Sequence, residues 1–265
     1  YMTGGNIAVD GALTVGGTTP SKNLTLNGAG ATSQVTQTAA IKAAGLELLG
    51  SGATHTLNHT GNDIKKLAGN TAKVSLTNNA AFAIDTVNTE GLTSVDTTLN
   101  STAAVTQTQA IRASGLELLG AGGNYTLNHA DNTIKKLAGD TGSVSLTNKG
   151  DLYISTVDSV DGLKGTGMVS ITTTAVPADA IPGDLILRKN LNAANINLNA
   201  EGAVLRDDAA SATDGILQAT SLLRIKVGSN IGTSDSRIQT NVTTLSMESR
   251  GDQFVTEANA VTVAA

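Results

Sequence analysis

Cysteine and tryptophan are absent from the 265-residue chain, and aromatic residues make up only 2% of it. Without cysteine, the chain has no disulfide bonds, no thiolate metal ligands and no cysteine nucleophile. The few aromatic residues, the net charge of −5 and the lack of any basic cluster longer than a lysine pair argue against a nucleic-acid partner. No apolar run approaches the roughly 18 residues of a membrane span. Residues 1–10 also lack the basic and then apolar pattern of a signal peptide.

The chain consists mainly of aliphatic and uncharged polar residues. Hydrophobic residues make up 40% of the sequence, which is enough for a core, but Val, Leu, Ile and Ala must fill it. Charged residues account for 15%, well below the usual quarter. Thr, Asn, Ser and Gly carry the polar character instead, and these residues suit turns and exposed strand faces. The composition predicts a narrow, regular core.

The clearest feature of the sequence is an internal duplication. The decapeptide NDIKKLAGNT at residues 62–71 returns as NTIKKLAGDT at 132–141. Aligned at a shift of 70, residues 32–87 and 102–157 share 35 identities in 56 positions. The two copies extend over residues 32–99 (the first copy) and 102–170 (the second copy). Because 70 residues exceed any single repeat unit of a solenoid, each copy is interpreted as three or more coils of about 20–25 residues.

Short runs that alternate apolar and polar residues occur along the whole chain and are bounded by Gly, Asn or Asp, which is typical of strands. They lie at residues 7–9, 13–15, 24–26, 56–58, 74–77, 82–84, 196–198, 223–227, 245–247 and 261–263. The apolar anchors Leu198, Ile225, Leu245 and Val263 follow one another at steps of about 18–27 residues, which is consistent with one strand-rich coil per step.

These patterns predict an all-β, single-stranded parallel β-helix over residues 1–265. Stacked coils would pair in parallel about 4.8 Å apart, which gives roughly 13 coils and a rod near 60 Å long. Both ends consist of ordinary repeat residues, so we expect a fragment of a longer chain. The one competing local structure is a helix over residues 39–49, which are rich in helix formers. Gly45 and Gly50 favour two strands around a glycine bend instead.

The pattern formed by residues 45–50 (GLELLG), 56–58, 62–69 and 74–77 resembles the repeats of filamentous haemagglutinin-type adhesins. Residues 230–233, 238–240, 245 and 254–259 are similar to repeats of the same families. The resemblance covers most of the chain from about Gly28 onward, and its motifs are shared by many exoproteins. It implies a right-handed β-helix in a bacterial exoprotein that is exported by two-partner or autotransporter secretion.

The same resemblance implies an extracellular location at the bacterial cell surface. The expected partners are a glycan or protein receptor on a host or neighbouring cell, with head-to-tail self-association of the rod as a further option. The secretion domain and outer-membrane barrel of these families have no counterpart in the sequence. Membrane anchoring is therefore expected only through regions outside these residues.

Two groups of residues are candidate binding sites. The lysine pairs Lys65, Lys66 and Lys135, Lys136 would form a ladder of positive charge for an acidic glycan or an anionic surface. The alternative is that they are solvated residues at a bend whose flanking Ile and Leu point inward. The triplet Arg250, Gly251 and Asp252 is the tripeptide that integrins read, but a turn at this point explains its glycine and aspartate equally well.

No metal, cofactor or catalytic site is predicted. His59 and His129 are repeat equivalents, but His55 is matched by Tyr125, and no carboxylates cluster near them. Asp207 and Asp208, with Arg224 and Lys226, are the nearest approach to a polygalacturonase-type site. Alternation explains Arg224 and Lys226 better, because both would face outward. The acceptor triplets for N-glycosylation at Asn23, Asn58, Asn100, Asn124 and Asn241 are expected in an Asn- and Thr-rich chain.

The sequence therefore predicts a structural and adhesive stalk segment of an exported bacterial surface protein, without catalysis. A variant of this hypothesis is the shaft of a contact-dependent toxin. The alternatives are a polysaccharide-degrading β-helix enzyme and a self-assembling extracellular filament.

Overall fold

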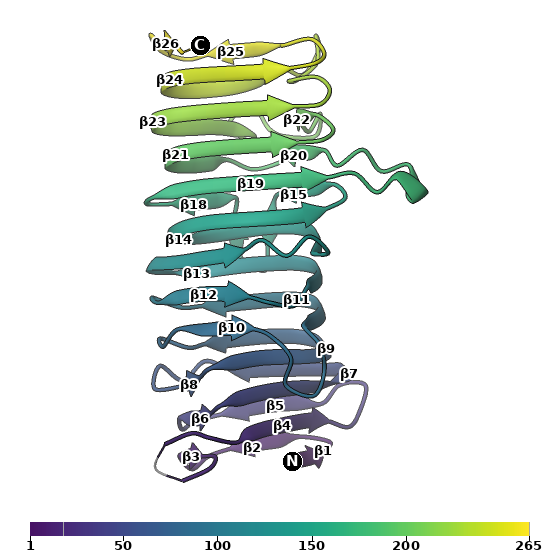
Figure 1. Cartoon of the computed structure of the whole chain (residues 1–265), viewed down its shortest axis with the longest axis vertical. Coiled ribbons are helices and arrows are strands. Elements are labelled where there is room, and N and C mark those ends of the chain that lie inside the picture. Colours follow the sequence, from purple (N-terminus) through teal and green to yellow (C-terminus); the bar gives the residue numbers. More distant parts are fainter. Residues whose placement is uncertain (18, 265) are drawn as a thin grey trace.

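A computed structural model describes residues 1–17 and 19–264. The chain forms an all-β solenoid of about 12 turns, with the first and last described turns at opposite ends of the stack (Figure 1). At about 4.8 Å per turn, the rod is about 58 Å long. The single helical segment within this range is a 3-10 turn, η1 (Pro177–Asp179). No helix in the described residues is long and apolar enough to cross a membrane.

Each turn contributes strands to successive faces, and the longest strands bend from one face to the next. The strands are β1 (Met2–Gly4), β2 (Ile7–Val9), β3 (Leu13–Thr14), β4 (Asn23–Gly28), β5 (Gln34–Gln37), β6 (Ile41–Ala43), β7 (Gly45–Leu57), β8 (Asp63–Ile64), β9 (Lys66–Thr77), β10 (Phe82–Ile84), β11 (Leu92–Asn100), β12 (Ala104–Gln107), β13 (Ile111–Leu127), β14 (Thr133–Lys149), β15 (Leu152–Ile154), β16 (Thr156–Val157), β17 (Val160–Asp161), β18 (Leu163–Gly165), β19 (Met168–Thr174), β20 (Leu185–Leu187), β21 (Leu191–Ala200), β22 (Val204–Arg206), β23 (Ile216–Val227), β24 (Ile238–Ser249), β25 (Val255–Glu257) and β26 (Thr262–Val263).

The predicted parallel β-helix is confirmed. Every ladder between described strands is parallel except the β16–β17 hairpin, and most strands pair with the turns below and above. The alternating runs of the sequence lie in strands, and the segment 39–49 contains the end-to-end strands β6 and β7 rather than a helix. The right-handed winding implied by the family resemblance stays a prediction.

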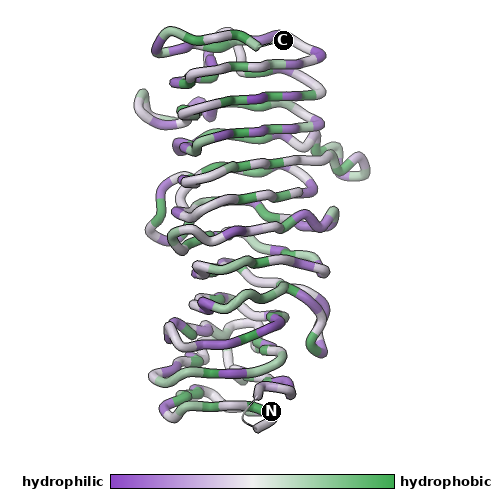
Figure 2. The backbone as a smooth tube through the Cα atoms, turned by 60° about the vertical axis from the view of Figure 1, so that its left-hand side comes forward, coloured by the Kyte–Doolittle hydropathy of each residue, from purple (hydrophilic) through white to green (hydrophobic). Residues whose placement is uncertain are grey.

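The core consists of aliphatic columns along the axis. Leu24, Leu46 and Leu67 stack in register, and each is at most 4% exposed. Ile64 and Ile134, which flank the lysine pairs, are also buried. Figure 2 shows the resulting alternation of hydrophobic and hydrophilic residues along each turn. Because each inward side chain packs on a like residue above and below, no turn buries its core alone.

The predicted order of the C-terminal anchors needs one correction. Ile225 pairs with Met247, whereas Leu245 pairs with Leu223 below it and Val263 above it. The two positions differ by two residues, so both face the core, and alternation alone does not distinguish them.

The two copies do not lie one above the other. The column of Lys66 runs upward through Ala83, Thr106, Thr126 and Ser145. Lys136, the equivalent of Lys66, lies in a different column, which contains Lys73, Asp96 and Gly115. A copy of 70 residues is therefore not a whole number of turns, and equivalent residues of the two copies lie on different faces.

Buried asparagines connect the turns at their corners. The side chain of Asn132 is fully buried, accepts a hydrogen bond from the Ile111 backbone N–H at 2.8 Å, and donates to the carbonyl groups of Leu127 and Thr147, both at 3.0 Å. It also exchanges two hydrogen bonds with Gln107. Asn62 makes the same set of contacts in the first copy. An amide has donors and an acceptor, so it can satisfy the backbone groups that a corner leaves unpaired.

Candidate functional site

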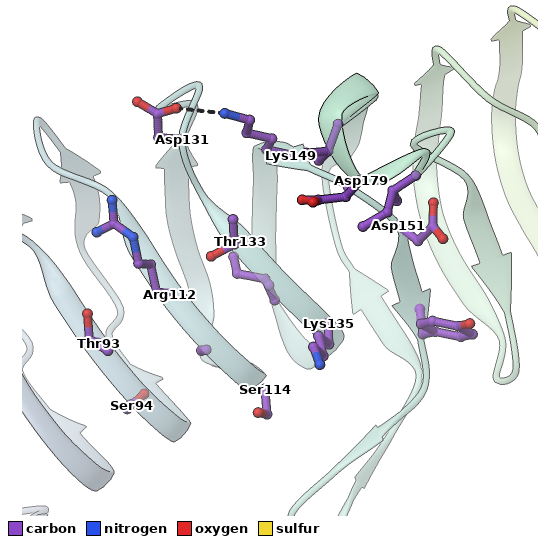
Figure 3. Close-up of a pocket in the computed structure, with 16 residues that line it drawn as sticks. Thr93, Ser94, Arg112, Ser114, Asp131, Thr133, Lys135, Lys149, Asp151 and Asp179 are labelled. Atoms are coloured by element: carbon purple, nitrogen blue, oxygen red, sulfur yellow. Dashed lines mark hydrogen bonds and ion pairs between the residues drawn. The ribbon is translucent and has the colours of Figure 1, made fainter. Parts of the chain in front are cut away.

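An open groove of about 800 Å³ lies on the side of the rod, mainly along the second copy (Figure 3). Its floor is built from the starts of β11, β13 and β14, where Thr93, Arg112 and Thr133 stack in one register column. Outward positions of successive turns thus present their side chains at the strand spacing of about 4.8 Å. The groove combines hydroxyl groups with charged side chains along the axis of the rod.

A chain excursion forms the wall of the groove. Residues 175–183 leave the stack after β19 and carry η1 (Figure 1). Asp151 anchors the base of this excursion, because its Oδ1 atom accepts hydrogen bonds from the backbone N–H groups of Gly183 at 3.1 Å and Asp184 at 2.8 Å. Val176 and Ile181 pair with each other and line the wall.

The charges in the groove are unequally neutralised. Lys149 forms an ion pair with Asp131 at 3.4 Å (Figure 3). Arg112 and Lys135 are exposed, and no carboxylate of residues 1–17 or 19–264 lies within 4.0 Å of either cationic group. Asp179 projects from the wall toward the same space. The lining therefore holds three cations and three carboxylates, and Arg112 and Lys135 on the floor are the two cations without an ion-pair partner among the described residues. Asp151 and Asp179 carry the negative charges on the side of the wall.

Tyr153 is the aromatic residue of the groove, and a chain of contacts holds its ring. The guanidinium carbon of Arg188 lies 4.3 Å from the centre of the Tyr153 ring. The Nε atom of Arg188 donates to the Oδ2 atom of Asp207 at 2.6 Å. A guanidinium that is fixed by a carboxylate and stacked on a ring restricts the motion of that ring. Asp207 thus helps to position Tyr153.

The first copy lacks these features at the equivalent positions. Lys42, Gly61, Asn79, Ala81 and Ala83 occupy the places of Arg112, Asp131, Lys149, Asp151 and Tyr153. Asp63, which forms an ion pair with Lys65 in the first copy, is replaced by Thr133 next to Lys135. The differences between two otherwise similar copies thus gather at the groove.

The lysine pairs do not stack into a ladder, because they lie on different faces, and their flanking Ile and Leu point inward as the alternative interpretation predicted. Binding by these lysines stays a prediction. In the first copy, Lys65 pairs with Asp63 and Lys66 pairs with Asp85 at 2.7 Å. The contact with Lys66, together with the Thr108 hydroxyl and the Thr86 N–H, lowers the pKa of Asp85 to about 2. In the second copy, Lys135 lines the groove, and Lys136 does not.

The Arg250, Gly251 and Asp252 triplet lies in an exposed turn after β24. Its backbone is fixed to the turn below: Gly251 N–H donates to the Ser229 carbonyl, and Asp252 N–H donates to Asn230 Oδ1, both at 3.0 Å. A Cβ atom at Gly251 would lie 1.9 Å from Asn230 Oδ1. The stacking of turns therefore requires the glycine, and the Arg250 and Asp252 side chains remain exposed. Receptor binding by this triplet stays a prediction.

The histidines have structural surroundings. His55 is fully buried, and burial lowers its pKa although the Leu26 carbonyl accepts a hydrogen bond from it. Tyr125 fills the equivalent place in the second copy, with its hydroxyl group bonded to the Leu99 and Leu119 carbonyls. Within the described residues, no group of three or more His, Asp or Glu side chains is arranged to hold a metal ion.

The structure does not bring together the residues of the hydrolase alternative. Asp207 is bound to Arg188, and this contact lowers the pKa of its carboxyl group, whereas a general acid needs a raised pKa. Arg224 faces outward on β23 between Asn197 and Ser246, as alternation predicts. Lys226 forms an ion pair with Glu248 at 2.9 Å.

Two buried glutamates, Glu47 and Glu117, lie beneath chain hairpins that sequence reasoning missed. In the first copy, hairpin 85–91 covers Glu47, which accepts hydrogen bonds from Thr25, Asn88 and Thr89 at 2.7–2.8 Å. Burial raises the pKa of Glu47, but these bonds outweigh it, and the pKa lies below its usual value of 4.5.

In the second copy, hairpin 155–162 lies over Glu117, and Asp158 replaces Asn88. Thr98 donates to Glu117 at 2.7 Å and lies 3.3 Å from Asp158, which is paired with Lys73. Burial raises the pKa of Glu117, and the charge of Asp158 raises it further against the effects of Thr98 and Lys73. The same residue thus has opposite pKa shifts in the two copies.

We expect the two hairpins to respond to pH in opposite directions. The raised pKa of Glu117 means that its ionisation destabilises the folded hairpin, so stability is lost as the pH rises through that pKa. Acidification from pH 7 to 4.5 should therefore increase the protection of hairpin 155–162 from hydrogen exchange. A lowered pKa gives stability that is lost in acid, so hairpin 85–91 should lose protection only below about pH 4.5, through Glu47 and Asp85. Hydrogen exchange, corrected for intrinsic rates, measures both.

The variant D158N supplies the control, because it gives the second copy the asparagine of the first. D158N should reduce the increase in protection that hairpin 155–162 shows between pH 7 and 4.5. It should leave the pH response of hairpin 85–91 unchanged. Equal responses of the two hairpins would contradict the assignment.

Comparison of the chain with family models, curated proteins and solved structures returns no match.

Proposed function

We propose that the chain is a rigid stalk segment of an exported bacterial surface protein, which presents binding surfaces on its sides without catalysis. The observation that carries this proposal is the unbroken parallel stack. Aliphatic columns continue from turn to turn, and buried asparagines tie successive corners together. Such a rod has no interdomain hinge, so it would hold what it carries at a fixed distance.

The irregular segments lie on the sides of the rod, where a partner can reach them. The two hairpins and the excursion at 175–183 project from the sides, and the groove opens beside them, without interrupting the parallel ladders. The location at a bacterial surface rests on the resemblance of the repeats to filamentous haemagglutinin-type adhesins. A receptor on another cell is the corresponding partner.

The rigid-rod part of the proposal is tested by a distance measurement between spin labels. Because the chain has no cysteine, T36C and T256C provide unique attachment sites on β5 and β25. Ten strand-to-strand steps separate them, so we expect a narrow distribution centred at about 50 Å. A broad or bimodal distribution would show a hinge and overturn the stalk.

The location is tested separately in cells that produce the protein. Antibodies against the chain should label intact cells as strongly as permeabilised ones. Labelling that requires permeabilisation would overturn the surface assignment while leaving the rod intact.

A further inference from the structure

The groove on the second copy has the composition of a binding site, and its charges indicate the class of ligand. Arg112 and Lys135 are exposed cations without a carboxylate partner in the described part of the chain, while most other charged groups nearby are engaged. Thr93, Ser114 and Thr133 add hydroxyl groups on the floor. Each of these can donate and accept hydrogen bonds.

The wall complements the floor. Asp179 on the excursion can accept hydrogen bonds from hydroxyl groups of a ligand. Tyr153 offers an aromatic surface, and one face of its ring is covered by Arg188. A sugar ring has an apolar face that can pack on Tyr153 and hydroxyl groups that can donate to the Asp179 carboxylate. Anionic substituents on separate rings would satisfy Arg112 and Lys135.

We propose that this groove binds an acidic oligosaccharide, with separate anionic substituents on Arg112 and on Lys135 and the sugar rings between Tyr153 and Asp179. The first copy does not repeat this site, because it has Ala83 for Tyr153 and neutralises Lys65 with Asp63. This inference rests on the proposed function, because it names the class of ligand that the side of the stalk would bind.

The test measures binding of three hexasaccharides of equal length to the whole chain by calorimetry: neutral chitohexaose, carboxylated hyaluronan and chondroitin sulfate, which carries both carboxylate and sulfate groups. We expect binding of one or both acidic sugars, and weaker binding at higher salt concentration. R112Q and K135Q should each reduce the affinity about tenfold, because each removes a charge-assisted contact. Y153A should also reduce it.

The matched control is the double variant K42Q/K65Q, which removes the first-copy counterparts of Arg112 and Lys135 and should leave the affinity unchanged. Circular dichroism should be the same for R112Q and K135Q as for the unmodified chain, since Arg112 and Lys135 make no ion pair within the described residues. Preference for the neutral sugar, no binding of either acidic sugar, or binding that R112Q and K135Q leave unchanged would overturn the site. The spin-label distance is independent of the groove, so failure of the site and failure of the rod are distinguishable.

Discussion

Replacement of Asn132 by leucine is expected to destabilise the second copy by about 3–5 kcal/mol. The leucine has a similar size, so the loss comes from polar groups rather than from a cavity. The Ile111 N–H and the carbonyl groups of Leu127 and Thr147 would remain buried without their side-chain partner. Each buried group that loses its hydrogen bond costs about 1–3 kcal/mol.

Native-state hydrogen exchange is the appropriate measurement, because stacked repeats need not unfold in a single step. The N132L variant should lower the opening free energy of β12, β13 and β14 more than that of β21 to β24. Asn128 provides the control: it is exposed and exchanges hydrogen bonds only with Ser145, so N128A should cost less than about 1 kcal/mol. Equal effects of the two variants would contradict the structural role of Asn132.

The second large effect is expected from G139A, at about 2–4 kcal/mol. A Cβ atom at Gly139 would lie 2.3 Å from the carbonyl oxygen of Leu118 in the turn below. The clash is with backbone, so the two turns must move apart locally, and the hydrogen bonds between β13 and β14 would lengthen. Gly69 lies against Leu48 in the same way, and G69A should have a similar effect in the first copy.

Urea denaturation followed by circular dichroism, with hydrogen exchange to locate the change, measures this effect. The control is G11A, because no atom of the described residues, apart from the adjacent residues of the chain, lies within 4 Å of the corresponding Cβ position. An alanine there should change the free energy of unfolding by no more than about 1 kcal/mol. If G139A were as mild as G11A, the close approach of the two turns would be refuted.

Most of the strands were predictable because alternation is a local property. The run Phe82–Ile84 coincides with β10, and Ile7–Val9 coincides with β2. The break within residues 39–49 was also predictable from a local signal, because Gly45 and Gly50 disfavour a continuous helix there. Hairpins 85–91 and 155–162 were not predicted, because polar segments that end in glycine are equally typical of the ordinary turns between strands.

The candidate site was only partly predictable. Lys135 was selected from the lysine pair, but as part of a ladder that does not form. Arg112, Tyr153 and Asp179 were missed, because the groove joins segments that lie apart in the chain and includes an excursion of the next turn. A signal was present in the alignment of the two copies, where Gly61, Ala81 and Ala83 are replaced by Asp131, Asp151 and Tyr153.

The amino-acid sequence alone determined that the chain is a stack of short strands with aliphatic residues inside, because the direction of each side chain follows from its position in the strand. Only the tertiary structure decided which residues lie above one another. The number of residues that loop out at each corner sets the register of the next turn, and this number depends on contacts between turns. For that reason the equivalent lysines Lys66 and Lys136 occupy different faces, and Lys135 lies beside the excursion at 175–183 in the groove.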